Sequence, residues 1–314
     1  TNNEILSKAR KEILKSCGGK LPPIFDPFSG GASIPFEAQR LGLPAHGSDL
    51  NPIAVAIGKA MIELPPKFKN CEPIHPGIKD QSFYRNLEGL AEDVKFYGEW
   101  IRNAAKKNIG HLYPLVDLPN KYGGGKSVVV SWIWARTVPS PDPAFADVHV
   151  PLMTNFVLSS KKGKEVWIEP VLDKINKTIK YNIQNSGTEE DISKASQGTA
   201  AGKRNGFRCL FSATPISYEY IRRVGNSGGI KTQLMAVVAQ GKNQRIFLPP
   251  DEKQHHAPTL AEPNTLNDIP LPNNTRDFKT PNYGVSNFSE LFTNRQLCAL
   301  QTFSKLILEA QDKI

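Results

Sequence analysis

Long apolar runs are missing from this chain of 314 residues. No stretch approaches the ~20 consecutive apolar residues that a membrane-spanning helix needs, which excludes a helical membrane protein. Residues 1–16 alternate charged and apolar side chains, and they lack the apolar centre of a signal peptide. The two absences predict a cytoplasmic protein with no membrane partner.

Cysteine is also scarce, and no two cysteines are spaced as a Cys-x-x-Cys pair. The four are Cys17, Cys71, Cys209 and Cys298. Disulfide frameworks of small secreted domains and structural zinc sites both need several closely spaced cysteines. We therefore expect reduced thiols and no bound metal.

Acidic side chains are outnumbered by basic ones, 30 to 39, which leaves a formal net charge of +9. Such a charge suits the binding of a polyanion, because Lys and Arg side chains that meet phosphates release condensed counterions. It also serves solubility alone. The net charge by itself does not separate these two explanations.

Residues 1–119 have the pattern of a parallel α/β unit. A buried strand is expected at Ile24-Phe25 and a second strand at 45–50, with helices at 4–16, 33–41, 53–62 and 87–107. Alternation of short strands with helices is typical of a parallel sheet. Only two parallel strands are readable here, too few for a doubly wound sheet with both faces covered, so further sequence or a partner chain is expected to complete it.

Residues 120–250 are rich in β-branched and aromatic side chains separated by Gly, Asn, Ser and Lys turns, which predicts a mainly antiparallel insertion. The expected strands lie at 127–138, 154–158, 164–168, 178–183, 218–224, 234–239 and 245–248. The polar segment 184–205 is expected to be an exposed loop. Residues 251–285 have the composition of a linker. Residues 286–314 are expected to form a helix that returns to the first domain.

The most informative stretch is 26–33, Asp-Pro-Phe-Ser-Gly-Gly-Ala-Ser. A strand ends in a carboxylate, and a turn of small residues lets the backbone approach a ligand at the start of a helix. Asp26 is placed to hold an ammonium group and Phe28 to form an apolar wall. Three spaced glycines for a dinucleotide pyrophosphate are absent, and a carboxylate beside the turn repels phosphate. The turn therefore favours a cationic ligand such as S-adenosylmethionine.

Asp49 ends the second strand, where an acid can accept hydrogen bonds from ribose hydroxyls. The stretches 25–31 and 48–52 together resemble the adenine-specific DNA methylases that carry a domain of unknown function, number 1156, which are amino-methyltransferases of the D-P-F-x-G-x-G type. The similarity continues through 62–68, 134–138, 214–223, 234–239 and 283–292, and so covers nearly the whole chain. The first two motifs are shared with many amino-methyltransferases, whereas the later ones are specific to this family.

The resemblance implies part of a Rossmann-like, S-adenosylmethionine-dependent methyltransferase domain acting on double-stranded DNA, with N6 of adenine as the first expectation and N4 of cytosine as the second. It assigns cofactor binding to Asp26, Pro27, Phe28, Ser29, Gly30, Gly31, Asp49, Leu50 and Asn51. Ala32 stands where the family has a third glycine, and its methyl group is expected to crowd the turn.

Two departures from the family limit what this chain can do. The loop (D/N)-P-P-(Y/F), which binds the target amino group and stacks on a flipped base, is absent. No catalytic residue is therefore assigned, and we expect that loop to lie beyond Ile314. Of the family's two Cys pairs only Cys209 remains, with Ser140 in the first knuckle, which predicts that no zinc is bound.

Basic clusters occur at 161–164, 203–204 and 222–223. They are either contacts to a phosphate backbone or solvated turns, and the sequence favours neither. Two rival functions stay open: an RNA methyltransferase of the same chemistry, and a module that binds cofactor or nucleic acid without turnover.

Overall fold

A computed structural model describes residues 3–77, 83–202, 204–264, 268–272, 274 and 276–314. The chain divides into two compact units: unit 1 comprises Thr1–Asn103 and Ile307–Ile314, and unit 2 comprises Ala104–Leu306. The division falls inside helices α5 (Glu88–Ile109) and α9 (Asn294–Gln311), whereas the sequence places the first boundary between residues 119 and 120. No helix in the described part of the chain is long and apolar enough to span a bilayer.

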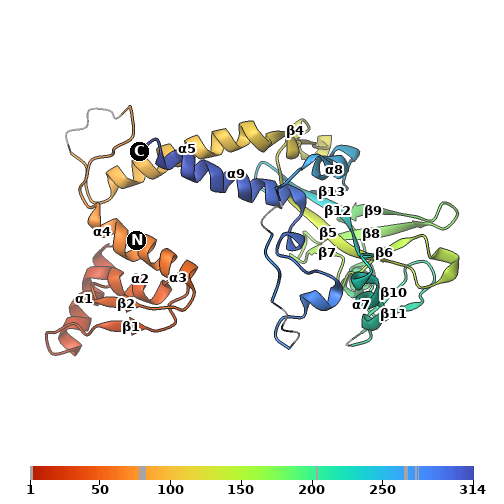
Figure 1. Cartoon of the computed structure of the whole chain (residues 1–314), viewed down its shortest axis with the longest axis horizontal. Helices are drawn as coiled ribbons and strands as arrows, with labels where there is room; N and C mark the ends of the chain where they lie inside the picture. Colours follow the sequence, from red (N-terminus) through yellow and green to blue (C-terminus); the bar gives the residue numbers. More distant parts are fainter. Residues whose placement is uncertain (1–2, 78–82, 203, 265–267, 273, 275) are drawn as a thin grey trace. The chain divides into compact units, whose positions relative to one another are not determined.

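Unit 1 begins with short strands and helices in alternation (Figure 1). The elements are α1 (Asn3–Ser16), β1 (Ile24–Asp26), α2 (Ser33–Arg40), β2 (Ala45–Gly47), α3 (Pro52–Gly58), the π-helical turn η1 (Lys59–Glu63) and α4 (Leu64–Lys67). Strands β1 and β2 pair in parallel, with Asp26 opposite Gly47. The parallel pair is confirmed. A complete doubly wound sheet stays a prediction, since the described residues of unit 1 form two strands.

The expectation that the first strand is buried is wrong. Phe25 is 64% exposed, and α1 buries none of its residues although its apolar side chains follow a helical stripe. The buried apolar side chains described in this unit are small, cyclic or aromatic: Ala32, Pro35, Ala38, Ala54, Pro73, Tyr84, Tyr97 and Ala310. A strand buries its side chains only where a second layer covers them, and among the described elements none covers Phe25.

Unit 2 is built mainly from antiparallel strands, as the sequence predicts. They are β3 (Val116–Asp117), β4 (Lys126–Ser127), β5 (Val129–Pro139), β6 (His149–Pro151), β7 (Val157–Ser159), β8 (Val166–Asp173), β9 (Thr178–Gln184), β10 (Phe207–Arg208), β11 (Pro215–Ile216), β12 (Lys231–Gln240) and β13 (Arg245–Leu248). The largest sheet has the order β13-β12-β5-β6, and β7-β8-β9 form a second sheet. The pairs β3–β4 and β10–β11 are also antiparallel.

Strand β12 is the centre of this unit. Six consecutive residues, Leu234 to Ala239, are at most 4% exposed. Met235 and Ala236 belong to a cluster with Trp167 and Ile168, whereas Leu234 and Val237 belong to a second cluster with β13. Because β12 packs on both faces, its sequence is a continuous apolar run and does not alternate.

Three expectations about the secondary structure of unit 2 are wrong. The expected strand 218–224 is helix α7 (Tyr218–Asn226), whose N-cap Ser217 accepts a hydrogen bond from Tyr220 N–H. The expected loop 184–205 contains helix α6 (Glu189–Gln197), which starts at a Thr188–Asp191 capping box. The expected linker contains α8 (Glu252–His256) and the 3₁₀ turn η5 (Ala257–Leu260). In each helix a side-chain cap at the N-terminus outweighs the composition.

Candidate cofactor site

The turn after β1 is held by one hydrogen bond of its own and by two hydrogen bonds to Ser48, which follows β2. Phe28 N–H donates to Asp26 Oδ1 at 3.1 Å, and Ser29 N–H donates to the carbonyl of Ser48 at 2.9 Å. Ser48 Oγ donates to the carbonyl of Pro27 at 3.3 Å. These bonds join the residues that follow β1 to those that follow β2, because the carboxyl ends of neighbouring parallel strands meet at one edge of the sheet.

Asp49 joins the two motifs directly. Its Oδ2 accepts a hydrogen bond from Gly30 N–H at 2.8 Å, and its Oδ1 accepts one from Asn51 N–H at 2.8 Å. The N–H groups of Asn51 and Gly30 lower the pKa of the Asp49 carboxyl, because each bond stabilises the ionised form. Asp49 therefore orders the turn that the sequence assigns to the cofactor.

The glycines of the turn face open space. Gly30 has a φ of +47°, and a Cβ added at Gly30 or at Gly31 meets no atom within 4 Å. Within the described residues, the backbone of the turn at Gly30 and Gly31 is therefore accessible from outside.

The expected apolar wall is not formed. Phe28 is 83% exposed and Leu50 is 99% exposed, so neither side chain closes the site within the described part of the chain. Asn51 caps α3, accepting a hydrogen bond from Ile53 N–H at 3.0 Å. The turn is thus an ordered edge, and it lacks the enclosure of a complete pocket.

Ala32 does not crowd the open face of the turn. It adopts a left-handed conformation, with a φ of 60°, and it is only 1% exposed. Its methyl group is buried beside α3, where a Cβ placed on Gly58 would lie 3.7 Å from it. The predicted obstruction by Ala32 is therefore wrong, because the methyl group is buried and does not project from the open face of the turn.

The two positions of the lost Cys pairs lie together in unit 2. Ser140 Oγ donates to Cys209 Sγ at 3.2 Å, and Cys209 is 2% exposed. Burial raises the pKa of the Cys209 thiol, but hydrogen bonds from Ser140, Ser212 and nearby N–H groups together lower it. In the described residues no three His, Cys, Asp or Glu side chains cluster as metal ligands.

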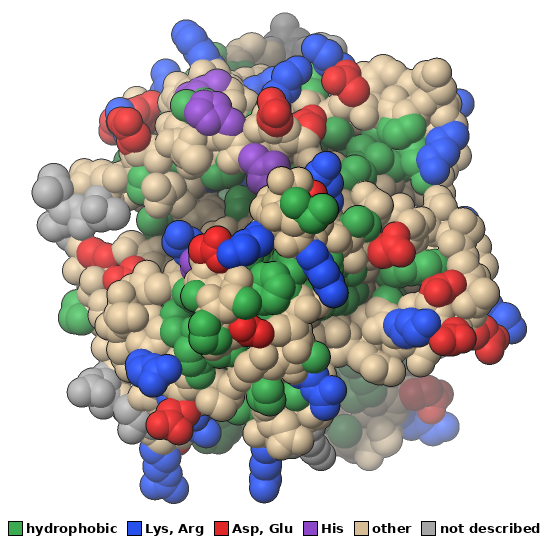
Figure 2. Space-filling view, turned by 90° about the vertical axis from the view of Figure 1, so that its right-hand side faces the viewer, with side chains coloured by type: hydrophobic (Ala, Val, Ile, Leu, Met, Phe, Trp, Pro, Cys, Tyr) green, Lys and Arg blue, Asp and Glu red, His purple; other side chains and the backbone are tan. Residues whose placement is uncertain are grey.

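The basic clusters differ in their surroundings. Arg222 lies over the ring of Tyr283 at 5.8 Å, and Arg223 lies over Tyr220 at 5.4 Å, so both cations are used within the fold. Lys203 lies outside the described residues. On the face drawn in Figure 2, Lys and Arg side chains are spread around apolar areas. Lys161 and Lys164 line a groove together with Lys121 and Arg245, which lie outside the basic clusters of the sequence.

Comparison with models of protein families, with curated proteins and with solved structures finds no significant match to this chain. The assignment of the turn to a cofactor thus depends on the resemblance of motifs and on the geometry given above.

Proposed function

We propose that unit 1 provides the S-adenosylmethionine-binding turn of a nucleic-acid amino-methyltransferase, with N6 of adenine in double-stranded DNA as the preferred target. The observation that carries the proposal is the Asp49–Gly30 hydrogen bond, which holds an open glycine turn at the carboxyl end of a parallel strand pair. Ligands of α/β proteins bind at this edge of the sheet.

The two carboxylates have different roles in this proposal. One oxygen of Asp26 accepts the Phe28 N–H, which leaves its second oxygen for the ammonium group of the methionine part. Asp49 keeps the turn in place and offers its remaining lone pairs to the ribose hydroxyls. The exposed side chains of Phe28 and Leu50 would be covered by the ligand and by the strands that complete the domain.

The transfer itself needs orientation more than acid or base catalysis. S-adenosylmethionine, held by Asp26 and Asp49, would supply its sulfonium methyl group to the exocyclic amine of the base; the S–CH₃ electron pair would stay on sulfur and the amine would lose a proton. This chain has no loop of the (D/N)-P-P-(Y/F) type to align the amine. We expect remaining methyltransferase sequence or a partner chain to supply that loop, with the cytoplasm as the site of action.

A second candidate is a module that binds nucleic acid without turnover. It is favoured by the cationic groove of unit 2, which needs no cofactor. Methylation of RNA by the same chemistry is the third possibility, and assays of DNA and RNA oligonucleotides with a protein that includes the missing loop separate these outcomes.

Calorimetry with S-adenosylmethionine tests the cofactor site. Loss of a hydrogen bond to a charged group should weaken binding about tenfold to a hundredfold in Asp26→Ala and in Asp49→Ala. Asp173→Ala is the matched control, because Asp173 also accepts two backbone N–H groups in an exposed turn, but in unit 2. Equal affinities of the wild type and all three variants, or no heat of binding for the wild type, would refute the assignment.

A further inference from the structure

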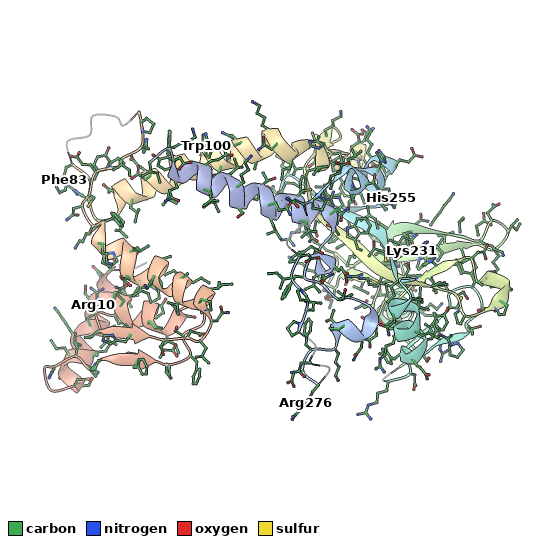
Figure 3. The ribbon with its side chains drawn as sticks, in the orientation of Figure 1. Arg10, Phe83, Trp100, Lys231, His255 and Arg276 are labelled. Atoms are coloured by element: carbon green, nitrogen blue, oxygen red, sulfur yellow. The ribbon has the colours of Figure 1, made fainter. Side chains whose placement is uncertain are left out.

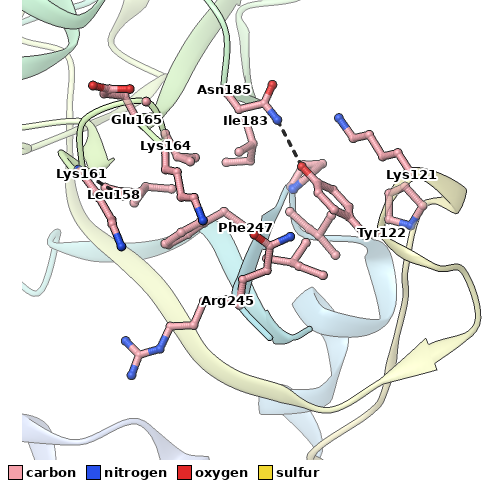
Figure 4. A pocket seen from close by; sticks show the side chains of 18 of the residues that line it. Lys121, Tyr122, Leu158, Lys161, Lys164, Glu165, Ile183, Asn185, Arg245 and Phe247 are labelled. Atoms are coloured by element: carbon pink, nitrogen blue, oxygen red, sulfur yellow. Dashed lines mark hydrogen bonds between the residues drawn. The ribbon is translucent and has the colours of Figure 1, made fainter. Parts of the chain in front are cut away.

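A groove of about 730 Å³ crosses one side of unit 2 (Figure 4). Its walls come from four segments that are far apart in the sequence: η3 (Asn120–Tyr122), the turn between β7 and β8, residues 183–185 at the end of β9, and the turn and strand of the β12–β13 hairpin. In Figure 4, Lys161 and Lys164 lie toward one end of the groove, and Lys121 and Tyr122 lie toward the other.

The charge of this groove is strongly positive. Lys121, Lys161, Lys164 and Arg245 line it, against the single carboxylate of Glu165. The ratio of four to one exceeds the ratio of 39 to 30 for the whole chain. In four other hollows of unit 2, none has more than two Lys or Arg side chains and each has at least one carboxylate.

No described carboxylate neutralises these four cations, although Lys121 lies over the ring of Tyr122, 5.0 Å from its centroid. Each is exposed, and none forms an ion pair with a described residue. By contrast, Lys177 and Lys194, which line two of the other hollows, pair with Asp147 and Glu190. Unpaired cations in a concave surface concentrate an anionic ligand there, because the low-dielectric walls focus their field.

The groove also offers an apolar surface between these charges. Along β13, Ile246 and Leu248 are buried in the core, whereas Arg245 and Phe247 point to the other face. Phe247 is half-buried and lies in the groove with Leu158 and Ile183. Alternation along a strand thus places a phenyl ring beside a guanidinium group on one accessible face.

We infer that this groove binds a single-stranded stretch of nucleic acid, with its phosphates on the four cations and a base against Phe247. A duplex presents its backbone and keeps its bases stacked inside, so it makes no use of an aromatic ring on the groove floor. Single strands are bound by grooves that combine cations with aromatic platforms. The inference stands on unit 2 alone and requires no cofactor.

Fluorescence anisotropy with a labelled oligothymidine of about 12 nucleotides, a length within the usual site size, tests the inference in the absence of S-adenosylmethionine. Four phosphate contacts predict a slope of about −3 for log K against log salt concentration on a single strand. The triple variant Lys161→Ala/Lys164→Ala/Arg245→Ala should bind about 100-fold more weakly at about 0.1 M salt, with a slope near −1.

A matched variant removes the same charge elsewhere in unit 2. The control replaces three exposed lysines that lie outside the groove: Lys106→Ala, Lys107→Ala and Lys174→Ala. It should bind within about twofold of the wild type, because contacts to phosphate and not net charge alone set the affinity. Equal losses of affinity in the two triple variants would overturn the assignment of the groove as the binding site. Wild-type affinity in the Lys161→Ala/Lys164→Ala/Arg245→Ala variant would overturn it as well.

Phe247→Leu tests the contact with the base apart from the contacts with the phosphates, because leucine keeps most of the apolar volume and removes the aromatic face. It should weaken oligothymidine about tenfold and leave inorganic polyphosphate, which has no bases, unchanged. An unchanged affinity for oligothymidine, or tighter binding of a duplex of the same length, would overturn the single-strand assignment. Neither result bears on cofactor binding by unit 1, which calorimetry measures separately.

Discussion

In unit 2, strand β12 buries six consecutive residues, whereas in unit 1 the first strand leaves Phe25 64% exposed and the turn after the second leaves Leu50 99% exposed. Unit 2 thus derives its order from apolar burial, the dominant favourable term in folding. The turn of unit 1 derives its order from local hydrogen bonds to Asp26 and Asp49. The comparison shows that hydrogen bonds to two carboxylates can order a turn whose apolar side chains remain largely exposed.

The first prediction compares the loss of a fully buried side chain in unit 2 with the loss of an exposed side chain in unit 1. Met235→Ala removes a side chain that is 0% exposed from the cluster between β12 and the second sheet. It should lower the free energy of unfolding of unit 2 by about 2–5 kcal/mol, because it removes apolar contacts and leaves a cavity. Leu50→Ala, at a side chain in solvent, should change stability by less than about 0.5 kcal/mol.

Urea unfolding followed by tryptophan fluorescence measures both variants. A similar loss of stability in Leu50→Ala would mean that Leu50 is covered in solution. The contrast between a buried unit 2 and an open turn in unit 1 would then be broken.

The second prediction compares one glycine from each unit. Gly198 ends α6 with a φ of 57° and a ψ of −138°, and a Cβ there would lie 2.2 Å from the carbonyl oxygen of Met153. Gly198→Ala should therefore destabilise unit 2 by about 2–4 kcal/mol, from backbone strain and overpacking. Gly30→Ala meets no atom and should cost about 1 kcal/mol, from its positive φ alone. Thermal unfolding of the two variants distinguishes them, and equal costs would show that the Gly30 turn is closed.

The third prediction compares two cations that lie over aromatic rings. Arg295 is 4% exposed, lies 3.7 Å from the centroid of Trp132 and 5.2 Å from that of Tyr113, and donates to the carbonyl of Leu112 at 3.3 Å. Burial lowers the pKa of Arg295, and no carboxylate in the described chain pairs with it. Arg295→Ala should cost about 2 kcal/mol, as expected for a desolvated cation–π contact.

The counterpart in unit 1 is exposed. Lys313 lies 5.0 Å from the ring centroid of Trp100, which projects from α5 (Figure 3). Lys313→Ala should cost about 0.5 kcal/mol, because water screens the contact. Urea midpoints test the pair, with Arg295→Met as a control that keeps an unbranched apolar side chain in place and removes the charge. A cost for Lys313→Ala as large as that for Arg295→Ala would contradict the proposed difference between the units.

Much of the local structure is predictable from the sequence. Strand β13 has the predicted bounds of 245–248, and α1 and α2 lie within one residue of theirs at each end. In these segments, periodicity, glycine turns and composition favour the same element. In α7 they conflict: Tyr218, Tyr220 and Ile221 favour a strand, whereas Ser217 favours a helix start, and the cap decides.

The candidate site is predictable where it depends on chain topology. Gly30 and Asp49 follow neighbouring parallel strands, so their proximity follows from strand pairing alone. The exposure of Phe28 does not follow in this way, because burial depends on which elements cover the turn. The groove was missed because Lys121, Lys164 and Arg245 come from three distant segments, and only the packed sheets bring them together.

The smallest effect predicted is a pH response confined to the turn of unit 1. The N–H groups of Asn51 and Gly30 lower the pKa of Asp49, so the carboxylate orders the turn above its ordinary pKa of about 4. That contribution is lost as the pH falls through the lowered pKa of the folded state. The amide resonance of Gly30 should titrate in NMR spectra with a midpoint below about 4, whereas that of the buried Val237 should not respond. Asp49→Asn removes the titrating group and should abolish the response at Gly30. A midpoint at or above the ordinary value would mean that the carboxylate does not accept these two hydrogen bonds. The turn of unit 1 would then not be ordered by Asp49, and the contrast with unit 2 would fail.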